Sequence, residues 1–254
     1  MDAVVLFSHG SVLTGAGEAL ERHAERIRRR AVAPIVEHAY LNYTEPDLPT
    51  TVARCVAAGA GRIVVTPYFL AAGKFVTADV PAAVAAAAER FPAIRFIVAE
   101  AIGYDPALAD AILESALNPG WEQDRAAGAA GREALVVVAH GSPRAEANDD
   151  LVRVVGDVDL RRMYGIVRAG FLECNAPSIP EAIDLCVAGG ARAVIVAPYF
   201  LHTGAHVAED IPAILRAASE RHPGVRLLQS PYLGLSEAIT EILIARTISA
   251  LNGA

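Results

Sequence analysis

The chain has 254 residues, of which 54% are hydrophobic and 20% charged, so it can build sizeable cores and is not a disordered protein. Its formal net charge of −7 argues against a nucleic-acid-binding protein, because binding phosphates requires a basic face. Gly, Pro or charged residues break its apolar runs before the roughly 18–20 residues that cross a bilayer, and its N-terminus has no signal-peptide pattern. We therefore expect a cytoplasmic monomer or homodimer with no nucleic-acid or membrane partner.

Short β-branched runs alternate with helical patterns through the first half of the chain. Strands are expected at residues 3–8, 34–41, 62–67 and 94–99, and helices at 15–30, 46–58, 79–91 and 105–117. Strands that are apolar throughout and separated by helices indicate a parallel sheet covered on both faces. Pro46 and Pro177 suit first helical turns, and Asp79 and Asp210 are candidate N-caps.

The second half repeats the first at a constant offset of 131 residues, the separation of His9 and His140. Residues 8–11 (SHGS) recur as 139–142 (AHGS), and 67–70 (PYFL) recur as 198–201. Strands are expected again at 134–139, 164–172, 193–198 and 225–230. Residues 118–133, rich in Gly, Ala and charge, are predicted to be a linker. The predicted fold class is α/β, with two tandem homologous domains at 1–117 and 134–254, each a four-stranded parallel sheet flanked by helices.

The two halves differ at three equivalent positions. The second half has ionisable side chains at all three: His140, Glu173 and His206. The first half has His9, Asn42 and Phe75. Each position follows a predicted strand, and the carboxyl ends of parallel strands meet at one edge of a sheet. Two imidazoles and a carboxylate suit a divalent ion such as Co²⁺, Fe²⁺, Ni²⁺ or Zn²⁺ and can accept protons near neutral pH. We predict one active site, in the second half, and a degenerate site in the first.

These motifs resemble a known family. HGS at 140–142, FLE at 171–173 and PYFL-x-x-G-x-H-x-x-x-DIP at 198–212 occur together in the CbiX/SirB-type sirohydrochlorin chelatases, of the class II chelatase superfamily. The resemblance covers both halves outside the linker. It implies insertion of a divalent metal, cobalt or ferrous iron, into the tetrapyrrole sirohydrochlorin on the way to cobalamin or sirohaem, with no organic cofactor. Two-domain members often keep the histidine pair in the N-terminal half, whereas here the C-terminal half is complete.

The resemblance also implies roles for single residues. His140 and His206 would handle the metal and the pyrrole protons, and Glu173 would complete the catalytic and metal-binding set. Polar residues on loops near the same sheet edges are candidates for binding the substrate: His9, Ser11, Lys74, Ser142, Arg144, Asn148 and His202.

Other residues are expected to be structural. His23, His38 and His222 lie in amphipathic patterns or before a proline and are predicted to be solvated, and Cys55 and Cys186 are predicted to be buried thiols. Cys174 is expected to point away from the site, because neighbouring side chains alternate along a strand. Two alternative functions stay open: a non-catalytic metal or tetrapyrrole carrier on the same fold, and a metal-dependent hydrolase whose His/Glu set activates water.

Overall fold

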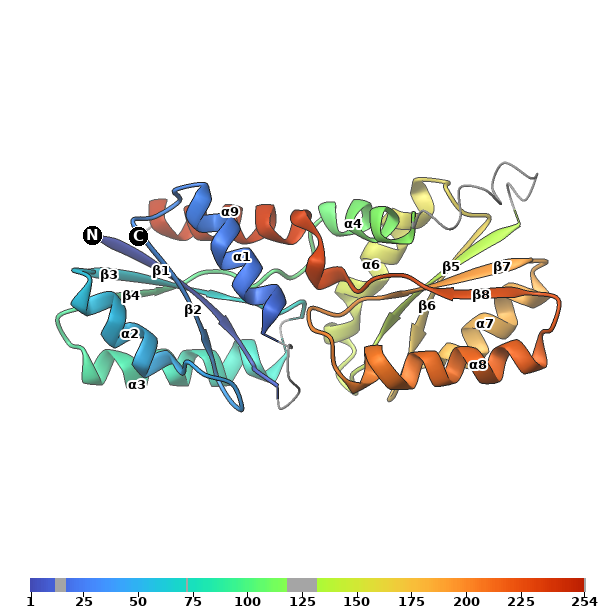
Figure 1. Ribbon diagram of the computed structural model, residues 1–254, viewed down its shortest axis with the longest axis horizontal. Helices are drawn as coiled ribbons and strands as arrows, with labels where there is room; N and C mark the ends of the chain where they lie inside the picture. The colour runs from blue at the N-terminus through green and yellow to red at the C-terminus, as the bar shows by residue number, and fades with distance from the viewer. Residues whose placement is uncertain (12–16, 72, 118–131, 254) are drawn as a thin grey trace. The chain divides into compact units, whose positions relative to one another are not determined.

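The computed structural model describes residues 1–254 apart from 12–16, 72, 118–131 and 254, and apart from the side chains of 146 and 147. The chain forms two compact units, one of Met1–Gly103 with Glu237–Ala254 and the other of Tyr104–Ser236 (Figure 1). Each unit contains one four-stranded sheet whose strands are all parallel. The predicted α/β class, with two copies of this sheet, is therefore confirmed. Most of the predicted linker, 118–131, and the predicted helix start at 15–16 lie outside the described residues.

The first unit has the strand order β2-β1-β3-β4. Its strands are β1 (Asp2–Ser8), β2 (Ile35–Tyr40), β3 (Arg62–Pro67) and β4 (Arg95–Val98). Its helices are α1 (Glu18–Arg29), α2 (Leu48–Ala57), the π-helical turn η1 (Phe75–Asp79), α3 (Val80–Arg90) and α9 (Glu237–Asn252). In Figure 1, α2 and α3 cover one face of this sheet, and α1 and α9 cover the other.

The second unit repeats this plan with the strand order β6-β5-β7-β8. Its strands are β5 (Glu133–Ala139), β6 (Ile166–Phe171), β7 (Ala193–Pro198) and β8 (Arg226–Gln229). Its helices are α4 (Ala107–Ala116), α6 (Glu146–Leu160), α7 (Ile179–Ala188), the π-helical turn η3 (His206–Asp210), α8 (Ile211–Arg221) and the short 3₁₀ turn η4 (Leu233–Leu235).

The units do not divide the chain at the predicted boundaries of 117 and 134. Helix α4 follows the first sheet in sequence, but it packs on α6 and β7 of the second unit. Helix α9, the last of the chain, packs on β3 and α1 of the first unit. The repeat pattern predicts where each helix lies in the sequence, but the apolar face of a helix does not indicate which of two similar sheets it packs against. Each half thus contributes its last helix to the other unit.

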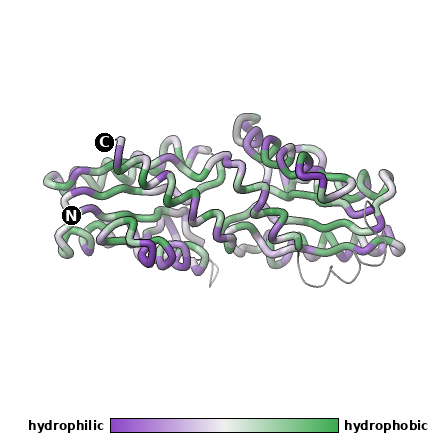
Figure 2. The backbone as a smooth tube through the Cα atoms, turned by 90° about the horizontal axis from the view of Figure 1, so that it is seen from above, coloured by the Kyte–Doolittle hydropathy of each residue, from purple (hydrophilic) through white to green (hydrophobic). Residues whose placement is uncertain are grey.

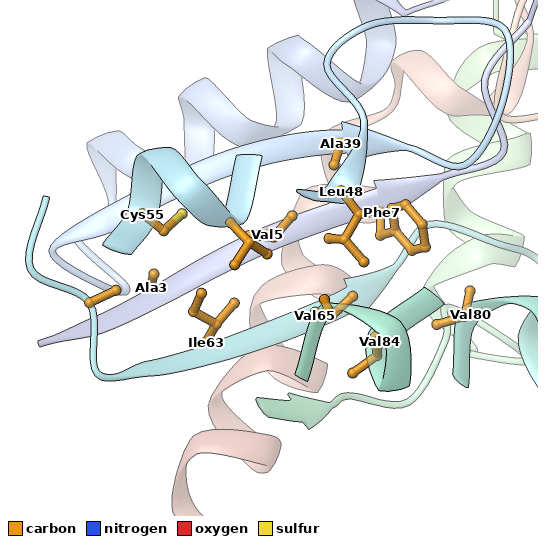
Figure 3. Close-up of a cluster of buried hydrophobic side chains, with 13 residues drawn as sticks. Ala3, Val5, Phe7, Ala39, Leu48, Cys55, Ile63, Val65, Val80 and Val84 are labelled. Atoms are coloured by element: carbon orange, nitrogen blue, oxygen red, sulfur yellow. The ribbon is translucent and has the colours of Figure 1, made fainter. Parts of the chain in front are cut away.

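The central strand of each sheet is buried on both faces, as the continuous apolar runs predicted. In β1, Ala3, Val5 and Phe7 point toward α2 and α3, and all three are fully buried (Figure 3). Cys55 and Cys186 lie in the equivalent cores of the two units, where burial raises the pKa of each thiol to about 11. The prediction of buried thiols is confirmed, and both stay protonated near neutral pH. Figure 2 shows the hydrophobic colour running along the strands.

The predicted helix starts at Pro46 and Pro177 are wrong. Helices α2 and α7 are capped by Asp47 and Ser178, so Pro46 and Pro177 precede the caps instead of opening the first turns. Asp79 and Asp210 do stand at the N-cap positions of α3 and α8, but neither side chain makes a capping hydrogen bond, because the π-helical turns η1 and η3 run directly into these helices. An aspartate followed by Val-Pro or Ile-Pro is typical of a helix start, and the sequence gives no sign of the turn before it.

The prediction of three solvated histidines is wrong for His23. Its side chain is completely buried, and Nδ1 lies 2.8 Å from Oγ1 of Thr240 in α9. The helix that covers it comes from the far end of the sequence, which local periodicity does not reveal. His38 is half-buried, and burial lowers its pKa. His222 lies near the surface, with Nε2 2.7 Å from Oδ1 of Asp184.

None of the described helices is long and apolar enough to cross a membrane.

Candidate active site

Two of the three predicted ligands come together at the carboxyl edge of the second sheet. His140 directly follows β5, and His206 opens the π-helical turn η3 after β7. Their ring centroids are 5.1 Å apart, with the planes at 71°, so the edge of one ring faces the other. The ring of Phe200 lies 6.3 Å from that of His206 and borders the pair on one side. The meeting of residues 66 positions apart (206 − 140) follows from the parallel topology.

An aspartate fixes the orientation of His206. Oδ2 of Asp210 lies 2.7 Å from Nδ1 of His206, across the five residues of η3. A carboxylate only accepts hydrogen bonds, so Nδ1 of the neutral ring carries the proton, and the lone pair is on Nε2. Such π-helical turns occur often at functional sites. The sequence prediction missed this role, although the spacing of four residues was a signal for it.

His140 is held in the same tautomer by its own loop. Its Nδ1 lies 3.2 Å from the carbonyl oxygen of Gly141, an acceptor, so its Nε2 also offers a lone pair. Gly141 has φ +91°, and a Cβ there would lie 2.0 Å from the carbonyl oxygen of Glu173. Only glycine permits this approach of the two loops. The backbone N–H of Glu173 donates to the carbonyl of His140 over 2.9 Å, which joins the same loops.

The third predicted ligand, Glu173, is joined to the pair only through its backbone. Its side chain is exposed, and across the described part of the chain no three His, Cys, Asp or Glu side chains gather closely enough to hold a metal. Strand β6 ends at Phe171, so Glu173 and Cys174 lie in a turn. The argument that placed Cys174 on the opposite face of a strand is therefore wrong, and its exposed thiol follows Glu173 with φ +63°.

Several predicted substrate-binding residues shape the loop after His140. The backbone N–H of Ser142 donates to Oδ1 of Asn175 over 2.7 Å. Nδ2 of Asn148 donates to the carbonyl of Ser142 over 3.0 Å, and the N–H of Arg144 donates to Oγ of Ser142 over 3.1 Å. The side chain of Arg144 is exposed, and His202 is half-buried in the loop after β7. The sequence prediction did not include Asn175, which anchors this loop.

The first unit keeps the histidine but blocks its lone pair. Nδ1 of His9 lies 3.1 Å from the carbonyl oxygen of Gly10, which selects the tautomer found at His140. Nε2 of His9, however, lies 3.5 Å from the amide nitrogen of Asn42, a donor. The ring of Phe75, at the position of His206, lies 4.3 Å from that of His9. This copy therefore lacks the pair of open nitrogens.

The other first-half candidates lie in the loops around His9. Ser11 is clamped by Thr44, whose Oγ1 accepts from the N–H of Ser11 and donates to its carbonyl, each over 2.9 Å. Nζ of Lys74 lies 3.9 Å from Oδ1 of Asp79, and the lysine side chain is mostly exposed. Thr44 is equivalent to Asn175, so both units close the loop after the histidine in the same way.

Comparison with known proteins identifies the family. The CbiX family model matches residues 3–118 and 134–250, which is nearly all of both halves. The chain belongs to the CbiX family. It is similar to the sirohydrochlorin cobaltochelatase of Priestia megaterium, with 28% identity over 220 residues, 86% of this chain and 70% of the relative. It is 42% identical to the sirohydrochlorin cobaltochelatase of Methanococcus maripaludis over 83 residues, 33% of this chain and 58% of the relative.

Solved structures with this fold cover almost the whole chain. SirB from Bacillus subtilis with Fe³⁺ matches with a TM-score of 0.83 and 21% identity, over 99% of this chain and 96% of that one. A CbiX described as the terminal enzyme for biosynthesis of siroheme in denitrifying bacteria matches with a TM-score of 0.63 and 25% identity, over 97% of this chain and 98% of that one. The fold described above, with one four-stranded parallel sheet in each unit, is therefore shared with SirB and CbiX structures.

Proposed function

We propose that this chain is a chelatase that inserts a divalent metal, cobalt or ferrous iron, into sirohydrochlorin. The observation that carries the proposal is the pair of His140 and His206, whose Nε2 atoms are both open at the ligand-binding edge of a parallel sheet. The relatives named above include sirohydrochlorin cobaltochelatases, and another relative from Priestia megaterium, 24% identical over 246 residues, is a sirohydrochlorin ferrochelatase. Structures of SirB hold Fe³⁺ or cobalt.

The chemistry requires a metal donor and a proton acceptor. A free-base tetrapyrrole loses two N–H protons when the metal forms bonds to its nitrogens. An imidazole nitrogen with an open lone pair can bind the metal before transfer or take up a pyrrole proton. His140 and His206 provide two such nitrogens, and the hydrogen bond that Nδ1 of His206 donates to Asp210 fixes the orientation of the His206 ring. In this mechanism Glu173, whose exposed side chain lies at the same edge but not in a three-residue metal cluster with the pair, passes protons to solvent.

The loops beside the pair are proposed to hold the carboxylates of the substrate. Arg144 offers an exposed guanidinium next to the histidine loop. Ser142, Asn148 and His202 lie on loops at the same sheet edge. His9, Ser11 and Lys74 occupy the equivalent edge of the first unit, with an ammonium group on Lys74. Metal ions enter this scheme as a substrate.

The test is metal insertion by the purified chain. Sirohydrochlorin is incubated anaerobically with Co²⁺, Fe²⁺ or Ni²⁺ in parallel, and the visible absorbance change is followed over several turnovers. A site of nitrogen and oxygen ligands with open positions is permissive, so we expect insertion of Co²⁺ and also of Fe²⁺ or Ni²⁺ at different rates. Insertion of only one ion would contradict the permissive site. Binding of metal or tetrapyrrole without turnover would instead indicate a carrier.

A further inference from the structure

The π-helical turn that carries His206 is held to its own sheet by one side chain. Nε2 of Gln229, the last residue of β8, donates a hydrogen bond to the carbonyl oxygen of Val207 over 2.9 Å. An amide oxygen cannot donate to a carbonyl, so the nitrogen of the side chain faces the turn. Gln229, β8 and the turn all belong to the second unit. The contact therefore joins the residue next to His206 to an edge strand of this sheet.

The carbonyl of Val207 cannot obtain the donor that the π-helical pattern would give it. In this pattern a carbonyl accepts from the N–H of the fifth residue on, as the carbonyl of His206 does from Ile211. The next carbonyl, that of Val207, would accept from residue 212, which is a proline and has no N–H. The side-chain amide of Gln229 supplies the missing donor.

The first unit has the same turn and the same proline but no such amide. Val98 stands at the position of Gln229, in the same register on its sheet, and Pro81 stands at the position of Pro212. The turn η1 forms nevertheless. The amide of Gln229 is therefore not needed to form a π-helical turn, and it occurs only in the unit that has the histidine pair.

The two turns also differ in how their first residue packs. The ring of Phe75 in η1 stacks on that of Phe69, with centroids 5.9 Å apart and planes at 20°. The equivalent rings of His206 and Phe200 are 6.3 Å apart and tilted by 39°. An imidazole that must keep Nε2 open for a ligand cannot be packed as closely as a phenyl ring. A contact to the backbone beside it holds the turn and leaves that nitrogen open.

The same sheet carries both imidazoles. Strand β8 pairs with β7, and β7 pairs with β5, which ends at the residue before His140 (Figure 1). Gln229 therefore links the turn of His206 to the strands that position His140. The ring centroids of the pair are 5.1 Å apart, and a metal ion bound by both Nε2 atoms requires this separation to be kept.

We propose that Gln229 is a positioning residue that sets the separation of the His140 and His206 imidazoles. The proposal rests on the proposed function, because this separation matters for metal that the pair binds and transfers. Gln229 acts through the backbone of the turn and is not a catalytic residue. Position is decisive in such a site, since a misplacement of about 1 Å can lower a rate by about 100-fold.

The test compares Co²⁺ binding and metal insertion in the full chain. Gln229→Met keeps the length of the side chain without the donor, and Gln229→Val introduces the residue that the first unit has at this position. Each should weaken the binding of Co²⁺ alone, followed by its visible spectrum, by about 3- to 20-fold. Each should lower kcat for insertion by a similar factor, with the KM for sirohydrochlorin within about twofold of wild type. Val98→Met, the matched control in the first unit, should change neither quantity.

Three outcomes decide the proposal. If both Gln229 variants bind and insert Co²⁺ within about twofold of wild type, the proposal is overturned. If Gln229→Met lowers the residual insertion rate of His206→Ala as much as it lowers the wild-type rate, Gln229 does not act through His206, and the proposal is also overturned. If the wild-type chain binds Co²⁺ but does not metallate sirohydrochlorin, the proposed function fails, and the Co²⁺ affinities of the variants still decide whether Gln229 positions the pair.

Discussion

The hydrogen bond between His206 and Asp210 gives the sharpest test of the site. Replacing the partner that orients a metal-binding imidazole typically lowers affinity or activity by about 10- to 100-fold. The side chains of His206 and Asp210 are 39% and 50% exposed, so water can replace part of the lost contact. We therefore expect Asp210→Ala to reduce metal insertion by about 10- to 30-fold, in the lower part of that range. The assay is the initial rate of absorbance change with sirohydrochlorin and Co²⁺.

The second unit contains a matched control for this variant. Oδ1 of Asp184 lies 2.7 Å from Nε2 of His222, and its side chain is 49% exposed, so the distance and the exposure of the aspartate match those of Asp210. His222 is less exposed than His206, at 21% against 39%, and Asp184 also pairs with Arg221. This control pair joins α7 to the end of α8, away from the histidine pair. Asp184→Ala should therefore leave the rate of metal insertion unchanged. If Asp210 acts through His206, Asp210→Ala should have little further effect in a His206→Ala background. Independent, additive losses in the double variant would refute this reasoning.

Three further predictions follow from single contacts. His140→Ala should reduce insertion by about 100-fold or more, and His9→Ala by less than about tenfold, because only His140 offers an open Nε2; equal losses would remove the asymmetry between the halves. Thr240→Val should lower the free energy of unfolding by about 1–3 kcal/mol in urea titrations, because it leaves buried His23 without this partner; a change below about 0.5 kcal/mol would contradict it. Burial lowers the pKa of His38, so the folded state binds fewer protons, and stability should fall as the pH drops through the ordinary imidazole value of about 6.5; His38→Gln should flatten that part of the pH profile, and an unchanged profile would oppose it.

The sheets were predictable because their strands are buried on both faces. The eight predicted strands agree with the observed ones to within two residues at each end. Each pattern occurs twice, so the repeat supports each assignment with a second copy. The packing of the last helices was not predictable, since α4 and α9 each cover the sheet of the other half. The complete burial of His23 depends on this exchange, because Thr240 belongs to α9.

The sequence predicted only those site residues whose positions follow from the ends of parallel strands. His140 and His206 meet because both follow neighbouring parallel strands, as expected. Glu173 and Cys174 lie in a turn, where the alternation of side chains along a strand no longer applies. The role of Asp210 depends on the π-helical turn, in which the side chains of residues 206 and 210 face each other, and the sequence pattern does not predict this turn.

Comparison of the two units shows which features form the π-helical turn and which side chains are specific to the site in the second unit. Both have the π-helical turn and its final aspartate, although only the second has a histidine at the first position of the turn. In the first unit Asp79 lies near Lys74 instead, and the turn still forms. The turn therefore does not depend on a His–Asp pair, and removing Asp210 should leave its backbone in place. A loss of activity in Asp210→Ala would then report on the orientation of the His206 imidazole, because the backbone of the turn does not need the His206–Asp210 hydrogen bond to form.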